Sequence, residues 1–133
     1  MTYHLQIVTP DGQRFDGQAV RLVIPTINGQ VGILARHINF VTAIGMGQAK
    51  VVTEAGERLA ACIGGMVAVT NGDVKVVATT FEWADEIDVE RAEASLARAE
   101  AMLADPNCDE QTRQYANARI KRAQVRLSIA EKK

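Results

Sequence analysis

The sequence changes from one structural pattern to another across Glu82-Trp83-Ala84-Asp85-Glu86-Ile87-Asp88-Val89-Glu90-Arg91-Ala92. Before this segment, short alternating runs separated by turn residues are typical of β-strands. After it, alanine and charged residues repeat at helical spacing. We therefore expect a β domain over residues 1–84 and a helical domain over residues 85–133.

The first domain contains several strand and hairpin signals. Alternating apolar residues over Tyr3–Val8 predict a strand, and Val20–Ile24 predicts another that is closed by Pro25. Turn residues at 54–57 and at Asn71-Gly72 each lie between two apolar runs, as in β-hairpins. Strands and turns at this spacing predict a small antiparallel sandwich or barrel.

Two apolar seams predict a pair of helices in the second domain. They step by three and four residues through Val89, Ala92, Leu96, Ala99 and Leu103, and through Ala116, Ile120, Ala123, Leu127 and Ala130. Pro106 interrupts the helical pattern between them, and so short a connection predicts an antiparallel hairpin. Because the seams are rich in alanine, they bury little apolar area, at ~25 cal/mol per Å². The hairpin is therefore either a permanently docked element or a detachable switch.

Composition excludes several classes of protein. The 133 residues are 47% hydrophobic but only 5% aromatic, so the core must be aliphatic. A net charge of -1 argues against nucleic-acid binding through bulk electrostatics. No run approaches the ~18 apolar residues of a membrane span, and Met1–Leu5 does not begin a secretory signal. Cys62 and Cys108 match no metal spacing, which favours reduced thiols in a cytosolic protein.

Arginines form a stripe beside each seam. Arg91 and Arg98 are seven residues apart on one helix face, which Asp88 joins. In the second helix the stripe consists of Arg119, Arg122 and Arg126. Converging arginines repel one another unless an anion joins them, and a polyphosphate suits that geometry. The alternative is that Asp88 is a helix N-cap and the arginines are solvated surface charge.

No catalytic set is recognisable in the sequence. His4 and His37 are isolated, and no nucleophile–base pair, phosphate loop or clustered metal ligands occur.

The order and spacing of several motifs resemble the epsilon subunit of the bacterial F-type ATP synthase. These motifs are Val8-Thr9-Pro10-Asp11-Gly12, Gly29-Gln30-Val31-Gly32-Ile33-Leu34 with His37, Gly64-Gly65-Met66, Ile87-Asp88-Val89-Glu90-Arg91-Ala92, and Ala123 to Glu131. The resemblance implies a β-sandwich of about ten strands followed by an antiparallel two-helix hairpin.

The resemblance also implies a non-catalytic central-stalk subunit that couples ion flow to ATP synthesis. Its sandwich would bind the gamma subunit and the membrane c-ring, at the cytoplasmic face of the bacterial plasma membrane. The folded helices would bind ATP and permit ATP hydrolysis, whereas the extended helices would reach the beta and alpha subunits and inhibit it. No cofactor or metal is required, and ATP acts as a regulatory ligand.

Two groups of residues are assigned by the resemblance. The nucleotide site comprises Glu82, Ile87, Asp88, Arg91, Ala92, Arg98, Arg122 and Arg126. The loop that contacts the c-ring or gamma comprises Gly32, Ile33, Leu34, Arg36 and His37.

The chain also departs from the family pattern. Many relatives have Pro-Gly before the loop histidine, where this chain has Ala35-Arg36, and Pro where it has Asn39. The first helix has Ser95-Leu96 where tight ATP binders are basic or small. The alternative function from another class is a freestanding ATP-sensing module. A small hydrolase is a third hypothesis, but it needs a nucleophile–base pair.

Overall fold

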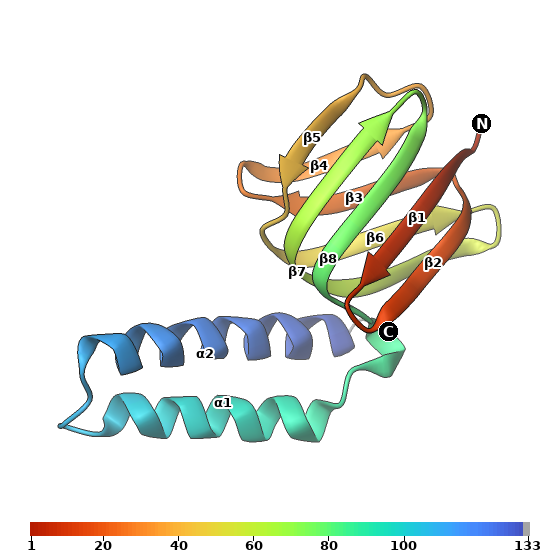
Figure 1. Ribbon diagram of the computed structural model, residues 1–133. Helices are drawn as coiled ribbons and strands as arrows, with labels where there is room; N and C mark the ends of the chain where they lie inside the picture. The colour runs from red at the N-terminus through yellow and green to blue at the C-terminus, as the bar shows by residue number, and fades with distance from the viewer. Residues whose placement is uncertain (132–133) are drawn as a thin grey trace. The chain divides into compact units, whose positions relative to one another are not determined.

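The computed structural model describes residues 1–131, and the predicted helical residues Lys132 and Lys133 lie outside them. The chain divides into two compact units, Met1–Trp83 and the part from Ala84 onward. The first unit contains eight strands (Figure 1). They are β1 (Tyr3–Thr9), β2 (Gly12–Ala19), β3 (Arg21–Thr26), β4 (Gly29–Leu34), β5 (Phe40–Ala43), β6 (Met46–Thr53), β7 (Gly56–Thr70) and β8 (Asp73–Trp83).

Two long strands, β7 and β8, belong to both layers of the first unit. The Gly56–Ile63 part of β7 pairs with β6, whereas its Met66–Val69 part pairs with β5. β8 pairs with both parts of β7, and its Val74–Val77 part also pairs with β1. One layer therefore contains β4, β3, β6 and the adjoining parts of β7 and β8, and the other contains β5, the remaining parts of β7 and β8, β1 and β2. Eight strands thus supply the ten segments of the predicted sandwich.

One strand pair differs from the predicted antiparallel pattern. β1 and β8 run parallel, with Leu5 opposite Val74 and Val8 opposite Val77. Parallel neighbours require a long connection, and here the intervening strands provide it. A sequence search for hairpins detects strands that follow one another closely, so it could not have found this pair.

The predicted hairpins are present. β7 and β8 are joined at Asn71 and Gly72, which have φ values of 51° and 89°. Two consecutive positive φ values are typical of the tight turns that fit the twist of a β-hairpin. β3 continues through Pro25 to Thr26, so the predicted strand end at Ile24 is wrong by two residues. Pro25 is tolerated because β6 pairs with β3 only over Arg21–Val23.

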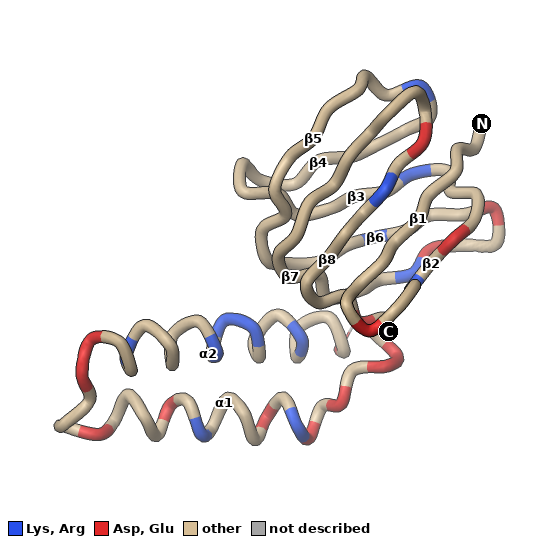
Figure 2. Tube along the Cα trace, viewed as in Figure 1, with Lys and Arg blue, Asp and Glu red and all other residues tan. Residues whose placement is uncertain are grey.

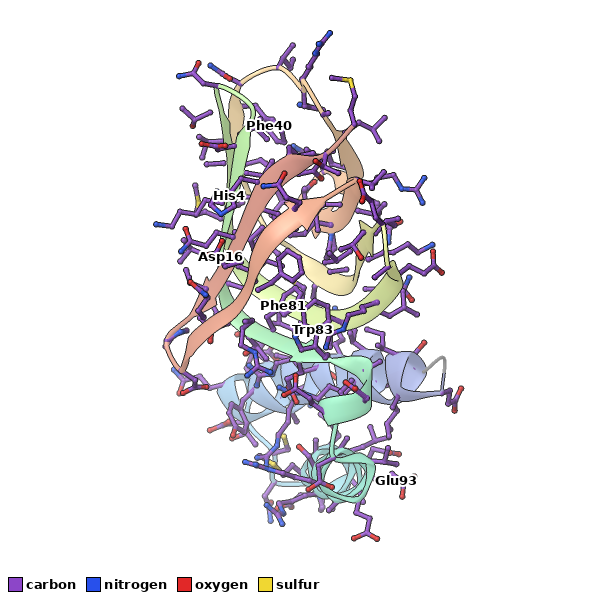
Figure 3. All side chains as sticks on the ribbon, turned by 90° about the vertical axis from the view of Figure 1, so that its right-hand side faces the viewer. His4, Asp16, Phe40, Phe81, Trp83 and Glu93 are labelled. Carbon is purple, nitrogen blue, oxygen red and sulfur yellow. The ribbon has the colours of Figure 1, made fainter. Side chains whose placement is uncertain are left out.

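The core of the sandwich is aliphatic, as the composition predicts. Its fully buried side chains include Leu5 and Ile7 of β1, Leu22 and Ile24 of β3, and Val76 of β8. They alternate with exposed or half-buried residues along β1, β8 and the first part of β3, so these segments turn one face inward. Aromatic residues gather near the end of β8 (Figure 3), where the Phe81 and Trp83 rings meet edge to face with centroids 5.0 Å apart.

The second unit is a helical hairpin. It contains the short 3-10 helix η1 (Ala84–Glu86), α1 (Val89–Ala104) and α2 (Glu110–Ala130), with the break where Pro106 predicts it. Asp109 caps α2, because its Oδ1 accepts a hydrogen bond from the Thr112 N–H at 2.7 Å. Both predicted seams contain buried alanines: Ala92, Ala99, Ala116, Ala123 and Ala130. Basic residues are concentrated on α2 and acidic residues on α1 and before it (Figure 2).

No helix within residues 1–131 is both long and apolar enough to cross a bilayer.

Candidate functional site

Asp88 forms the N-cap of α1. Its backbone is extended, and its Oδ1 accepts a hydrogen bond from the Arg91 N–H at 3.0 Å. This bond satisfies one of the backbone donors that the first turn of a helix leaves without a helical partner. The capping interpretation from the sequence is therefore confirmed. The role of Asp88 in nucleotide binding stays a prediction, with one carboxylate oxygen already committed to the cap.

A hydrogen bond between the helices fixes the register of the hairpin. Arg119 Nε on α2 donates to Ser95 Oγ on α1 at 2.8 Å. Both helices rise ~1.5 Å per residue and run in opposite directions. A residue a given number of positions before Ser95 on α1 therefore lies at the same level as the residue that many positions after Arg119 on α2. Arg122 therefore lies at the level of Ala92, and Arg126 lies at the level of Asp88. The antiparallel register thus brings four residues of the predicted nucleotide site together at the open end of the hairpin.

Arg91 and Arg98 extend this set along α1. Both side chains are exposed, whereas Arg122 and Arg126 on α2 are half-buried. Arg98 lies three residues beyond Ser95 toward the loop, so it stands about 15 Å along the axis from the level of Arg126. The arginines therefore form an elongated cluster, which fits a chain of phosphates better than a single small anion.

Glu82 and Ile87 lie outside the hairpin itself. Glu82 is half-buried on β8 and belongs to the first unit. Ile87 is buried between η1 and α1. Within the second unit the hairpin brings together Asp88, Arg91, Ala92, Arg98, Arg122 and Arg126, and the nucleotide-binding role of all eight residues stays a prediction.

Three residues near this cluster are absent from the predicted site. Arg119 bonds to Ser95, and its Nη1 also donates to the Tyr115 hydroxyl at 3.1 Å. The arginine stripe had already indicated Arg119, because it precedes Arg122 by three residues on the same face. Ser95 shares a face with Arg91 and Arg98 by the same spacing, which is the signal that could have found it.

The predicted contact loop has both buried and exposed members. Ile33 on β4 is fully buried, and its carbonyl oxygen accepts a hydrogen bond from the Tyr3 hydroxyl at 2.7 Å. Its side chain is therefore part of the core, and the membership of Ile33 in the contact loop stays a prediction. Gly32 and Leu34 lie beside it on β4 and are exposed, because neighbouring residues of a strand face opposite sides.

The loop beyond β4 is anchored at two points. Asn39 Oδ1 accepts a hydrogen bond from the Asn71 N–H of the β7–β8 turn at 2.8 Å. The His37 ring lies 5.1 Å from the Phe40 ring between centroids, and its Nδ1 is 2.9 Å from the Ile38 carbonyl oxygen. Ile38 is 76% exposed. The loop thus presents an exposed apolar side chain next to the exposed Arg36, and its role as a contact loop stays a prediction.

Histidine chemistry does not suggest catalysis. His4 is isolated in the sequence, but its Nε2 on β1 lies 2.5 Å from the Asp16 Oδ1 on β2 (Figure 3). Hydrogen bonding to Asp16 raises the pKa of His4. The pair is on an exposed sheet surface. Within residues 1–131, no three histidine, cysteine or carboxylate side chains gather as metal ligands.

Comparison with protein families covers both units. Residues 2–84 match the beta-sandwich domain of the ATP synthase delta/epsilon chain, and residues 85–131 match its long alpha-helix domain. The chain belongs to the ATP synthase delta/epsilon chain family. Membership confirms the resemblance inferred from the sequence motifs, and it makes the chain a non-catalytic subunit of the ATP synthase.

Individual members of the delta/epsilon family match over nearly the full length. The ATP synthase epsilon chain of an Exiguobacterium species is 39% identical over 99% of this chain and 98% of its own length. The ATP synthase epsilon chain of Shouchella clausii is 35% identical over 99% of this chain and 97% of its own length.

Solved structures agree. A chain of the Euglena gracilis mitochondrial ATP synthase, in a structure of OSCP, F1 and c-ring, superposes with a TM-score of 0.80 at 25% identity, over 96% of this chain and 79% of that one. A chain of the Tetrahymena thermophila mitochondrial ATP synthase central stalk and c-ring gives a TM-score of 0.64 at 15% identity, over 96% and 95%, and supports the fold.

Proposed function

We propose that this chain is the epsilon subunit of the central stalk in a bacterial F-type ATP synthase. Its β-sandwich binds the gamma subunit and the c-ring, so that the stalk couples ion flow to ATP synthesis. The family matches over residues 2–84 and 85–131 are the observation that carries this proposal. The similar proteins named above from Exiguobacterium and Shouchella are bacterial epsilon chains, which supports a peripheral position at the cytoplasmic face of the plasma membrane.

The loop after β4 supplies the contact with the stalk in this proposal. Leu34 is 56% exposed and Ile38 is 76% exposed, with Arg36 between them. Exposed apolar side chains that gather in one part of a folded surface are typical of interaction sites. The bond between Asn39 and Asn71 limits the motion of this loop, which lowers the entropy lost on docking.

The helical hairpin is a regulatory element that binds ATP when closed. The arginines of α1 and α2 supply the phosphate contacts, and Ala92, which lies at the level of Arg122, is buried. Extension of the helices breaks this cluster and releases them toward the alpha and beta subunits, where they inhibit ATP hydrolysis. ATP favours the closed form only to the extent that it binds that form more tightly than the extended one.

Co-purification tests the stalk assignment. The full chain is co-expressed with the gamma subunit and c-ring of its own organism, and a stoichiometric complex is expected. Ile38→Glu should weaken that complex, because a carboxylate replaces an exposed apolar contact. The control is Ala55→Glu, which places the same charge in the exposed β6–β7 turn. Absence of a complex with the unaltered chain would overturn the proposal.

Calorimetric titration with ATP, with and without Mg²⁺, tests the regulatory role separately. Binding that Arg126→Ala weakens supports the hairpin as a nucleotide sensor. Absence of binding up to millimolar ATP would remove that role and leave the stalk assignment standing.

A further inference from the structure

Arg119 is held between the two helices of the hairpin by neutral partners. Its guanidinium donates to Ser95 Oγ at 2.8 Å and to the Tyr115 hydroxyl at 3.1 Å, and its central carbon lies 5.9 Å from the Tyr115 ring centroid. That position lies within the range of a cation–π contact. These contacts direct a long side chain that in solvent would sample many rotamers. Arg119 is therefore preorganised while it keeps its full positive charge beside these partners.

The guanidinium of Arg119 still has donors to offer. An arginine carries five N–H groups in a planar fork, and the two bonds to Ser95 and Tyr115 use two of them. The remaining three suit the oxygens of a phosphate, which bind arginine through parallel charge-assisted hydrogen bonds. A neutral hydroxyl partner at Ser95 leaves that capacity intact, whereas a carboxylate would have consumed it.

Arg119 also lies at the middle of the arginine cluster. On α1, Arg91 precedes Ser95 by four residues and Arg98 follows it by three, so both flank the interhelical bond on one face. On α2, Arg122 follows Arg119 by three residues. Among the nearby acidic side chains, Glu90 and Glu93 are exposed, and Figure 3 shows Glu93 extending outward from α1. The cluster thus concentrates positive charge around the Ser95–Arg119 bond.

We propose that Arg119 is a further phosphate-binding residue of the hairpin, positioned by Ser95 and Tyr115. The inference rests on the proposed nucleotide-binding role of the helices. Ser95 and Arg119 lie on different helices, so their bond exists only when α1 and α2 are paired. A polyphosphate that engages Arg119 in this orientation binds the closed form more tightly and shifts the population toward it.

Titrations of the full chain with ATP, tripolyphosphate and adenosine test the proposal. Arg119→Ala should weaken ATP and tripolyphosphate by a similar factor, at least about tenfold, as expected for loss of charge-assisted hydrogen bonds. Adenosine affinity should not change. The matched control is Arg113→Ala, which removes an exposed arginine of α2 that pairs with Glu110 on its own helix at 3.9 Å. Circular dichroism confirms that each variant keeps its helices.

Variants of the positioning residues separate orientation from charge. Ser95→Ala and Tyr115→Phe each remove one hydrogen bond but keep the guanidinium, so each should weaken tripolyphosphate by a smaller factor than Arg119→Ala. In the Arg119→Ala background, Ser95→Ala should have little further effect, because the two residues act through one bond. Tripolyphosphate should slow amide exchange in both helices of the unaltered chain and do so less in Arg119→Ala.

Three results would overturn the proposal, and they are distinguishable. Unchanged ATP affinity in Arg119→Ala, with binding by the unaltered chain, would remove Arg119 from the site and leave the nucleotide role standing. Weaker ATP binding with unchanged tripolyphosphate binding would show that Arg119 does not contact phosphate. Failure of the unaltered chain to bind either compound would overturn the nucleotide role together with this inference.

Discussion

Gly65 on β7 lies against the backbone of Val77 on β8 so closely that a Cβ added to Gly65 would stand 2.0 Å from the Val77 carbonyl oxygen. The same Cβ would lie 2.8 Å from the Cα of Ala78. Gly65 also has a φ of 116°, which side-chain-bearing residues rarely adopt. The passage of β7 between the two layers therefore depends on the absence of a side chain at this position.

Gly65→Ala should destabilise the sandwich by about 3 kcal/mol or more, because the atoms that the added Cβ would meet are β8 backbone, which cannot move away without disturbing the sheet. Denaturant unfolding followed by the fluorescence of Trp83 measures the change. Gly32→Ala is the matched control, since an added Cβ there meets no atom within 4 Å, and a change well under 1 kcal/mol is expected. Equal effects of the two substitutions would contradict the close-packing argument.

Arg36→Gly should stabilise the chain by up to about 1 kcal/mol. Arg36 has a φ of 65°, which costs a side-chain-bearing residue more than glycine, although glycine loses more backbone entropy on folding. Arg36→Ala keeps the strained backbone and should leave the thermal midpoint close to that of the unaltered chain. If Arg36→Gly lowered the midpoint, the arginine side chain would have to form a stabilising contact that outweighs its backbone strain.

The His4–Asp16 pair should make the sandwich slightly more stable in acid than at alkaline pH. Hydrogen bonding to Asp16 raises the pKa of His4, so the folded chain holds this proton more tightly than the unfolded chain. The stabilisation is complete below the ordinary histidine pKa of about 6.5 and is lost as the pH rises through the raised value. NMR titration of the His4 ring should give a lower pKa in Asp16→Asn. An unchanged pKa in that variant would show that Asp16 is not its cause.

Asp88→Ala should reduce the stability of α1 by about 1 kcal/mol, because the Arg91 N–H loses its acceptor. Asp88→Asn keeps an acceptor oxygen and should preserve helix content in circular dichroism. Asp88→Asn therefore separates the effect of the negative charge at this position from the effect of the capping hydrogen bond. If Asp88→Asn lost as much helix content as Asp88→Ala, the charge and not the hydrogen bond would stabilise the helix start.

The sequence predicted those strands, turns and helix ends that depend on the preferences of neighbouring residues. The alternation in β1, the turn at Asn71-Gly72 and the break at Pro106 all reflect preferences of neighbouring residues, so they were visible without a structure. The parallel pairing of β1 with β8 depends on residues about 70 positions apart, and no local preference reports it. The buried side chain of Ile33 follows from the alternation of β4, whereas its place in the contact loop was assigned by the resemblance and stays a prediction.

Local spacing along each helix also could not give the contacts between the two helices at the candidate site. Helical spacing placed Arg122 and Arg126 on one face. The pairing of Ser95 with Arg119, however, depends on where α1 ends before Pro106 and where α2 begins after it. Only a structure gives that register. The spacing of the arginine stripe selected Arg119. Its hydrogen bonds to the hydroxyls of Ser95 on α1 and Tyr115 on α2 became visible only in the structure.

Trp83 is the one tryptophan of the chain, and it ends the last strand of the sandwich. Its ring is buried beside Phe81, and the Arg58 guanidinium carbon lies 3.7 Å from its centroid. The chain consequently carries a native fluorophore in the β unit and places its α-helical dichroism in the other unit. Heating monitored by both signals can therefore distinguish cooperative melting of the whole subunit from sequential melting, without any attached dye.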